Sequence, residues 1–533
     1  MKRSFYITTP IYYVNGQPHI GTAYTTVAAD VVARYHRQQG EDVFFLTGTD
    51  EHGINNERAA RARGLDPRVH VEEVAGVFQA LWRTLDISHT RFIRTTEPQH
   101  RRAALELWRR LEARGDLYRG VYEGPYCPRC EAYYQEEELS GGLCPIHGQP
   151  CEYSREENFF FRLSRYQEPL AQLVRDTDFV QPAVRRNEVL GVLRQGLRDF
   201  SVTRRNVQWG IPVPGQPDEV LYVWIDALAN YLSGVGFPDD LATFGRYWPA
   251  DVHLVGKDII RFHCLYWPAI LLSAGLPLPR RVFAHGWLTD HGRKIGKSSG
   301  NAVAPESLAA TLGVDGLRYC LLRAAPFGQD GDAAPDSLVA CYNAELANNY
   351  GNLVQRATTL VARYAGGVVP APGPSGPAER RLQDAAATLQ GTVAGAFERL
   401  ALDEAIEAVA GFVTAANRYA EETAPWQLAR QTRGVAVPAQ GEQDAGAAGR
   451  GAADGAGERL HTALCFLAEA ARLASWYLWP VIPTTAAAAH RRLCGQAPDV
   501  TGGAGGAFGW LEPGARVEAA QPLFPRLRPP LPG

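Results

Sequence analysis

The stretch VNGQPHIGTAYTTVAAD (residues 14–30) sets turn-forming residues directly before apolar residues at helical spacing. It follows the apolar run SFYITT (residues 4–9), which predicts a short buried strand. It precedes DVFFLTGTDEHG (residues 42–53), which predicts a second strand that runs into a polar turn. A strand, a helix from about residue 21 to 39 and another strand indicate a parallel sheet. Its site should lie where the polar loops meet, at the carboxyl ends of the strands.

The start of this predicted helix has two interpretations. Free N–H groups and a partial positive charge let a helix N-terminus bind phosphate. Gly21 would let a nucleotide approach the backbone, and His19 could donate a hydrogen bond to a phosphate oxygen. Taken alone, the Pro-His-x-Gly pattern also fits an ordinary helix cap, so both interpretations stand at this point.

Length and composition limit the class of protein. A chain of 533 residues is too long for one core, so we expect three or four structural units. It contains no run of 18 apolar residues and no signal-peptide pattern, so we expect a cytoplasmic protein that does not contact membranes. A net charge of −3 excludes a uniformly basic coat for nucleic acid but leaves room for a local patch.

Lysine is rare and unevenly placed. Only Lys2, Lys257, Lys294 and Lys297 occur among 54 basic residues, and three of the four lie within about forty residues. The segment DHGRKIGKSSGN (residues 290–301) sets two of them three apart in a Gly/Ser-rich loop. A mobile loop with two ammonium groups can close over a polyphosphate and stabilise its charge. A solvated basic turn is the alternative interpretation.

Four residues have the spacing of a zinc site. Cys127, Cys130, Cys144 and His147 follow the pattern C-x2-C-x13-C-x2-H, which suits tetrahedral Zn²⁺ with three thiolates and one imidazole. Because the protein fills all four positions, we expect one structural zinc. Cys151 is a surplus thiol that could replace His147. A local cluster within nine cysteines indicates a reducing compartment rather than a disulfide scaffold.

The pattern of elements predicts an α/β fold in which a Rossmann-like parallel sheet is split by an insertion and followed by an all-α bundle. The parts are a first catalytic half (1–116), a connective insertion with the zinc knuckle (117–202), a second half with the lysine loop (203–340), a helical domain (341–515) and a proline-rich tail (516–533). Residues 435–458 are Gly/Ala-rich and predict a disordered loop. The tail cannot be helical and is expected to lie extended along another domain.

Six stretches together resemble class I aminoacyl-tRNA synthetases and, within that class, the methionyl-tRNA synthetase family. They are TTPIYYVNGQPHIG, FLTGTDEHG, FIRTTE, YVWIDALANYL, HLVGKDIIRFH and GNLVQR. The resemblance runs from residue 4 to the tail. It implies a methionine–tRNA ligase that uses ATP, with Mg²⁺, to convert L-methionine to methionyl-adenylate and transfers methionine to tRNA(Met), releasing pyrophosphate and AMP.

The resemblance also assigns residues. The signature residues are His19, Gly21, Thr22, Lys294, Lys297 and Ser298; ATP would lie against His19, Gly21, Lys257, Asp258, Lys294 and Lys297. The methionine pocket would be lined by Ile11, Tyr13, Asp50, Trp224, Ala227, Tyr231 and His263, with Asp50 binding the substrate ammonium. Aromatic walls suit a polarizable sulfur, although plain core packing is the alternative. Asn352, Arg356 and Trp426 match positions that read the CAU anticodon, where unstacked bases stack and hydrogen-bond.

Two signatures depart from the family pattern. Thr22 stands where the family has a second histidine, and Ile295 and Gly296 replace the Met and Ser of Lys-Met-Ser-Lys-Ser. A threonine can hydrogen-bond a phosphate but carries no charge, and losing one transition-state donor typically costs about a hundredfold in rate. We therefore predict a working but slow adenylating enzyme.

The departures leave three functions open. The first is a methionyl-tRNA synthetase; the second is a paralog that acts on a non-tRNA acceptor or gives inhibitor tolerance; the third is a non-catalytic tRNA-binding regulator. A cysteine-specific synthetase is disfavoured, because its zinc would face the substrate pocket and a closed knuckle would not. The chain lacks the C-terminal tRNA-binding module through which some relatives dimerise, so we expect a monomer.

Overall fold

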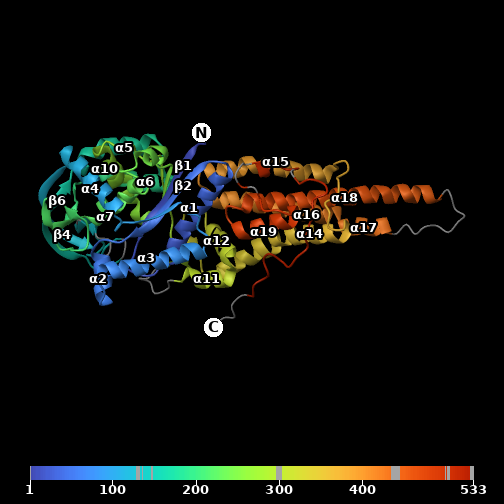
Figure 1. Ribbon diagram of the computed structural model, residues 1–533, viewed down its shortest axis with the longest axis horizontal. Coiled ribbons are helices and arrows are strands. Elements are labelled where there is room, and N and C mark those ends of the chain that lie inside the picture. The colour runs from blue at the N-terminus through green and yellow to red at the C-terminus, as the bar shows by residue number, and fades with distance from the viewer. Residues whose placement is uncertain are drawn as a thin grey trace.

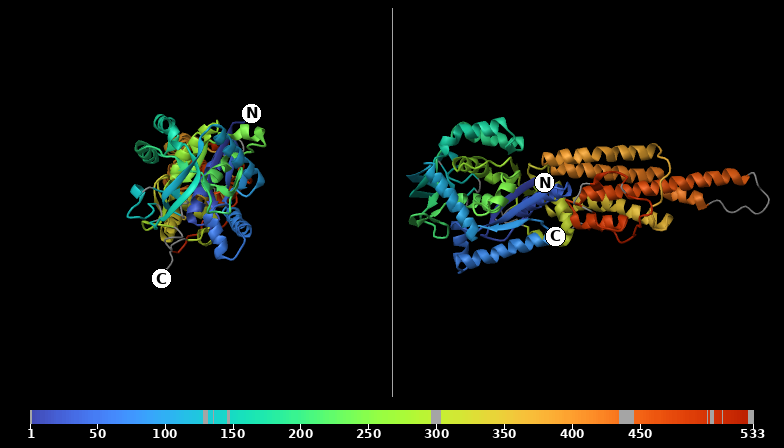
Figure 2. Two further views of the ribbon diagram at one scale, coloured as in Figure 1. Left: turned by 90° about the vertical axis from the view of Figure 1, so that its left-hand side faces the viewer. Right: turned by 45° about the horizontal axis from the view of Figure 1, so that its top comes forward.

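The computed structural model describes residues 2–127, 132–134, 136–145, 148–295, 303–433, 445–498, 500, 504–509 and 511–528. The molecule is elongated, with a mixed α/β body at one end and a rod of helices at the other (Figure 1). The two further views show the same long axis and place the insertion at the end of the body away from the rod (Figure 2).

A six-stranded sheet forms the centre of the body, in the order β3-β2-β1-β12-β13-β7, and every pairing in it is parallel. Its strands are β1 (Ser4–Tyr13), β2 (Asp42–Asp50), β3 (Arg91–Arg94), β7 (Val180–Gln181), β12 (Val252–Gly256) and β13 (Val282–His285). Helix α1 (Ile20–Gln38) connects β1 to β2. The predicted strand–helix–strand order is confirmed, and α1 begins within one residue of the predicted start.

Alternation along the strands explains why both faces of the sheet are covered. Phe5 and Ile7 pack into the core that includes α1, whereas Tyr6 points into the core on the other face. Successive side chains of a strand point to opposite faces, so an apolar run is buried on both sides. Helices around the sheet are α2 (Ile54–Ala62), α3 (Pro67–Thr84), α4 (Pro98–Ala113), α7 (Val223–Leu228), α8 (Asn230–Ser233), α9 (Leu241–Tyr247) and α10 (Trp267–Ser273).

The segment after α4 forms a separate antiparallel sheet in the order β5-β4-β6-β8. Its strands are β4 (Leu117–Cys127), β5 (Ala132–Tyr133), β6 (Glu152–Phe161) and β8 (Phe200–Ser201), and the helices α5 (Gln167–Asp176) and α6 (Ala183–Gln195) follow β6. The same segment supplies the edge strand β7 to the main sheet.

Two small sheets complete the body. One contains β9 (Thr203–Arg204), β10 (Pro212–Val213) and β11 (Gln216–Leu221), and the other contains β14 (Leu288–Asp290), β15 (Arg293–Lys294) and β16 (Gly331–Asp332). Three helices lead to the rod: α11 (Pro305–Leu312), α12 (Val314–Arg323) and α13 (Pro335–Cys341).

The rod consists of a π-helix, η6 (Tyr342–Tyr350), with α14 (Gly351–Tyr364), α15 (Pro377–Glu398), α16 (Leu402–Thr423), α17 (Pro425–Arg433), α18 (Ala445–Leu478) and α19 (Pro483–Cys494). Residues 445–458 form the first part of α18, which differs from the predicted disordered loop; residues 434–444 lie outside the described residues. Alanine is the strongest helix former, so an Ala-rich stretch can extend a helix despite its glycines. Within the described chain no helix is long and apolar enough to cross a membrane.

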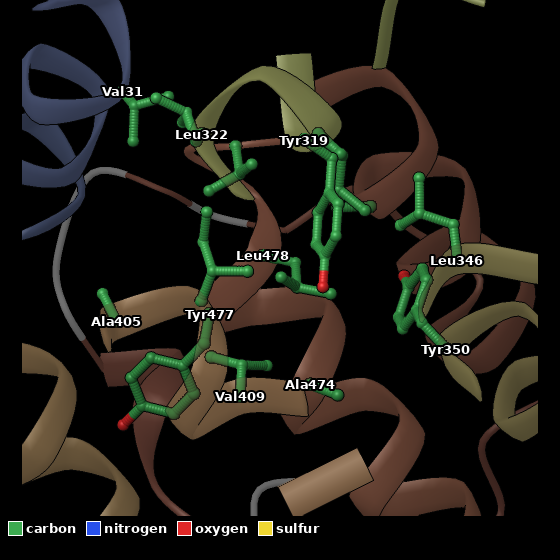
Figure 3. Close-up of a cluster of buried hydrophobic side chains, with 14 of the residues drawn as sticks. Val31, Tyr319, Leu322, Leu346, Tyr350, Ala405, Val409, Ala474, Tyr477 and Leu478 are labelled. Atoms are coloured by element: carbon green, nitrogen blue, oxygen red, sulfur yellow. The ribbon is translucent and has the colours of Figure 1, made fainter. Parts of the chain in front are cut away.

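One continuous core joins the rod to the body. Val31 of α1 lies near Leu322 of α12, and beyond them Val409, Leu478 and Tyr350 continue the cluster into the rod (Figure 3). The fully buried Arg318 lies at the centre of this joint and donates to Asp30 at 2.7 Å. It also donates to the carbonyls of Leu85, Pro480 and Val481, so its guanidinium connects α1 to the turn after α18.

The described part of the tail, residues 516–528, contains no helix and contacts the rod, as predicted. Asn343 of η6 holds Leu527 by two hydrogen bonds of 2.9 Å, one to its carbonyl and one from its N–H. The ring of Phe524 packs edge-on against Tyr342 and Tyr350.

Candidate active site

The turn between β1 and α1 is closed by a reciprocal pair of caps. The Nδ1 atom of His19 accepts the N–H of Gly21 at 3.1 Å, and the Thr22 hydroxyl accepts the N–H of His19 at 3.1 Å. The same hydroxyl donates its only hydrogen to the carbonyl of His19 at 2.6 Å. Thr22 is therefore committed to the cap in this structure, and its hydroxyl is not directed to a phosphate.

This cap also orients the His19 ring. Since Nδ1 accepts a hydrogen bond, the neutral imidazole carries its proton on Nε2 and can donate from there. A Cβ on Gly21 would lie 2.9 Å from Cε1 of His19, closer than real Cβ atoms come. Glycine is thus required for the imidazole to fold over the helix start. The residues that form this cap are the ones for which the sequence offered phosphate binding as the other interpretation.

A pocket of about 380 Å³ opens at the carboxyl edge of the main sheet. It brings together residues from β1, α1, β2, α7, η3 (Lys257–Ile259), the π-helical turn η4 (Phe262–Tyr266) and β15. Among the predicted residues its lining includes Ile11, Tyr13, His19, Gly21, Thr22, Asp50, Trp224, Ala227, Tyr231, Asp258, His263 and Lys294. Residues separated by more than 250 positions in the sequence therefore share one cavity.

One end of the pocket is aromatic and uncharged. The Tyr231 hydroxyl meets Nε2 of His263 at 2.7 Å, and Nδ1 of His263 lies 3.0 Å from the carbonyl of Ile259. Because Nδ1 must donate to that carbonyl, Nε2 accepts from Tyr231 and the imidazole is neutral. Burial lowers the pKa of His263 to about 4 and raises that of Tyr231. Trp224 stacks on Phe262 with ring centres 3.7 Å apart.

Asp50 ends β2 and is almost fully buried at the same edge. Behind it, the carboxylate of buried Asp226 bonds to two imidazoles, and we call this group the His52–Asp226–His100 relay. His52 Nδ1 lies 2.7 Å from one carboxylate oxygen, and His100 Nε2 lies 2.7 Å from the other. His100 also contacts the Ser233 hydroxyl at 2.9 Å. Burial opposes ionisation of Asp226, but His52 and His100 lower its pKa to about 2. Asp226 is therefore ionised although it is fully buried.

We call the part of the pocket around Lys294 the cationic end; Asp258 also lines it, whereas the predicted Lys257 lies outside the lining, against the same indole, Trp287. Lys257 donates to both oxygens of Asp330 at 2.7 and 2.8 Å, and Lys294 lies on β15 at the pocket wall. Burial would raise the pKa of Asp330, but Lys257 and the N–H of Trp287 lower it. Ile295, one of the two departures from the family's loop pattern, is buried in the main core. Gly296, Lys297 and Ser298 lie outside the described residues.

The predicted anticodon residues lie far from this pocket, in the rod. Asn352 and Arg356 share one face of α14 and meet α16, where Asn352 donates to Asn417 at 3.1 Å and Arg356 pairs with Glu421 at 3.4 Å. Trp426 is half-buried on α17, which packs against α14.

The described cysteines of the insertion form a small buried cluster of their own. Cys127 and Cys144 are each 1% exposed and pack with Tyr134, and Cys151 contacts this cluster. Burial and the two neighbouring thiols raise the pKa of Cys151 to about 11. Cys130 and His147 lie outside the described residues, and in the part of the chain that is described no group of three or more acidic, His or Cys side chains is arranged to hold a metal.

Sequence reasoning missed three features of the pocket. Phe262 stacks on the Trp224 ring, His52 and His100 both bond to Asp226 behind Asp50, and the Trp287 ring contacts both Lys257 and Lys294. Phe262 directly precedes the predicted pocket residue His263, and Trp287 lies three residues before the lysine loop, so their positions carried a signal. His52 and Asp226 lie in two of the quoted stretches, but no sequence pattern joins them to His100.

Comparisons with known proteins identify the family of this chain. The profile of the family described as tRNA synthetases class I (M) matches residues 5–151 and 137–358. Methionine–tRNA ligase of Caldanaerobacter subterraneus subsp. tengcongensis is 42% identical over 99% of this chain and 79% of that protein. The enzyme of Thermosynechococcus vestitus is 42% identical over 99% and 98%, respectively. A structure of Mycobacterium tuberculosis methionyl-tRNA synthetase in complex with methionyl-adenylate covers 98% of this chain and 100% of that chain, with a TM-score of 0.90 and 42% identity.

Proposed function

Because this chain belongs to the methionyl-tRNA synthetase family, we propose that the pocket at the carboxyl edge of its main sheet is where it activates methionine. The enzyme converts L-methionine and ATP to methionyl-adenylate and charges tRNA(Met). One observation carries the assignment of the site: a neutral aromatic end, the carboxylate of Asp50, the His19 donor and the Lys294 ammonium line one cavity.

Methionine fits the uncharged end. The Asp50 carboxylate would bind the substrate ammonium, while Trp224, Ile11 and the Tyr231–His263 pair would enclose the thioether. A neutral His263 matters because an imidazolium would have to be desolvated beside an apolar side chain. Ala227 and Tyr13 complete the wall.

ATP fits the cationic end, with its adenosine near Asp258 and its phosphates between His19 and Lys294. A carboxylate oxygen of methionine attacks the α-phosphorus, a new P–O bond forms, and the bond to the bridging oxygen breaks. That oxygen keeps the electron pair and pyrophosphate leaves. The Nε2–H of His19 and the ammonium groups of Lys294 and Lys297 stabilise the developing negative charge.

The second step uses the same pocket. A ribose hydroxyl at the 3′ end of tRNA(Met) attacks the carbonyl carbon of the adenylate and the ester bond forms. AMP leaves with the electrons of the C–O bond, and its phosphate takes up the hydroxyl proton. Asn352, Arg356 and Trp426 would select the tRNA by binding its anticodon bases. Trp426 offers a ring for stacking, and the two polar side chains offer groups for base edges.

Two metals accompany this proposal. Mg²⁺ would arrive with ATP and neutralise part of the phosphate charge. Zinc would be held by Cys127, Cys130, Cys144 and His147; the burial of Cys127 and Cys144 in one cluster fits a thiolate site. Zinc there would stabilise the insertion and take no part in the reaction. Cys151 remains an alternative to His147, and metal analysis of Cys151→Ser and His147→Ala distinguishes them.

Anticodon residues on α14 and α17 and a complete pocket favour tRNA charging over a paralog with a non-tRNA acceptor or a non-catalytic regulator. The test is a pair of assays on the purified chain: methionine-dependent exchange of pyrophosphate into ATP, and charging of tRNA(Met). We expect both activities from a cytoplasmic monomer. Exchange without charging would support the non-tRNA acceptor, and neither activity would support the regulator.

A further inference from the structure

Two of the four lysines of the chain contact the indole ring of Trp287. The Lys294 Nζ lies 3.6 Å from the centre of its indole ring, and the Lys257 Nζ lies 4.0 Å from the same ring. Both distances are well within the range in which an aromatic face attracts a cation. Because lysine is so rare in this sequence, the convergence of two on one indole is a specific arrangement.

The backbone on either side of this ring is held firmly. The N–H of Trp287 donates to Asp330 at 2.9 Å, and its carbonyl accepts the N–H of Gly331 at 2.9 Å. A Cβ on Gly286 would lie 2.2 Å from the backbone of Gln329, so the two segments pass in direct contact. The indole is thus carried by backbone that is hydrogen-bonded on both sides, directly before the parallel pairing of β14 with β16.

The two lysines differ in what else holds them. Lys257 is anchored by both oxygens of the Asp330 carboxylate, so its charge is already paired. Lys294 stands at the start of the lysine loop and lies on the pocket wall. A ring face attracts an ammonium more weakly than a carboxylate does, so the contact between Lys294 and the indole yields to an arriving phosphate more readily than the pair of Lys257 with Asp330 does.

We propose that Trp287 is a positioning residue for ATP, whose indole holds the Lys294 ammonium at the nucleotide end of the pocket before the triphosphate binds. This role rests on the proposed ATP site. A lysine stem that is already ordered loses less conformational freedom when it meets a phosphate. The indole Nε1 also donates to Asp258 at 3.4 Å, so the same ring contacts the carboxylate placed near the adenosine.

A double-mutant cycle on methionine-dependent ATP–pyrophosphate exchange tests this role. We expect Trp287→Leu to lower kcat/KM for ATP about tenfold, while the KM for methionine stays within about twofold of wild type. Trp287→Phe keeps an aromatic face and should lose no more than about threefold. In a Lys294→Ala background, Trp287→Leu should cause almost no further loss, because the indole acts through that ammonium.

Trp479 gives a matched control, since its ring also faces a cation, with Arg34 5.5 Å from the ring centre, away from the pocket. Trp479→Leu should leave the KM for ATP unchanged. An undiminished tenfold loss in the Lys294→Ala background, an equal loss in Trp287→Phe and Trp287→Leu, or no loss in either would each overturn the proposal. If Trp287→Leu does not fold, Trp287→Met carries the same expectation. A wild-type chain without any exchange activity would instead overturn the proposed function.

Discussion

The two ends of the pocket solve different problems with different chemistry. At the methionine end, Tyr231 and His263 are fully buried, neutral and satisfied by each other and by a backbone carbonyl. At the nucleotide end, Lys257 and Lys294 are partly exposed cations that share one indole ring. Recognition of the apolar side chain of methionine calls for a dry wall, whereas the charge that develops on a phosphate calls for cations that are already in place. A substitution at one end should therefore impair the use of one substrate and leave the binding of the other unchanged.

The largest effect is expected at the cationic end. Lys294→Ala removes a donor to the developing charge, so the rate of ATP–pyrophosphate exchange should fall on the order of a hundredfold. Lys2→Ala is the matched control because Lys2 is exposed at the opposite side of the sheet from the strand C-termini. A loss of less than about threefold for Lys294→Ala would show that this ammonium does not act on the phosphates.

A smaller effect is expected at the neutral end. Tyr231→Phe leaves the buried Nε2 of His263 without its donor, so the KM for methionine should rise about tenfold while that for ATP is unchanged. Tyr350→Phe is the matched control, since its buried hydroxyl bonds to Ser475 in the joint to the rod. Equal changes in both KM values would contradict the separation of the two ends.

Thr22 also lines the pocket, and its substitution by histidine should have two modest effects: the protein should become less stable and the exchange reaction faster. Thr22→His removes the hydroxyl that caps α1 and should lower the free energy of unfolding by about 1 kcal/mol. The added imidazole could supply the donor that the family signature contains, so the exchange rate should rise about fivefold. Thr22→Ser retains the cap and should change neither quantity. An unchanged exchange rate in Thr22→His would mean that the missing histidine does not limit catalysis.

The smallest effect concerns pH. Burial holds the pKa of His263 at about 4, below its usual 6.5, so the ring stays neutral in the folded protein until the pH falls toward that value. The methionine Kd should therefore vary by less than about twofold between pH 5.5 and 8 and rise only below about pH 5. The contribution of neutral His263 to the free energy of unfolding has the same sign. It is fully present above about pH 6.5 and is lost as the pH falls from there toward 4, because the histidine of the unfolded chain takes up its proton first. A Kd that rises already near pH 6.5 would contradict a neutral, buried ring.

Local patterns predicted the parallel sheet, α1 and the loops at its carboxyl edge, because strand alternation and helix spacing are properties of neighbouring residues. They could not separate a cap from a phosphate site at His19, since both depend on how one imidazole folds over Gly21. The roles of Trp287 and Asp226 arise only when distant segments meet in space. The start of α18 was misjudged because composition hid the helix propensity of alanine.

The most direct test of the separation between the two ends is the methionine Kd of Lys294→Ala, measured by equilibrium dialysis without ATP. A neutral methionine wall that works independently of the lysines predicts a Kd within about twofold of wild type, although exchange falls on the order of a hundredfold. A methionine affinity that falls in parallel with the exchange rate would contradict the account, because it would mean that one rigid site, and not two separate ends, binds both substrates.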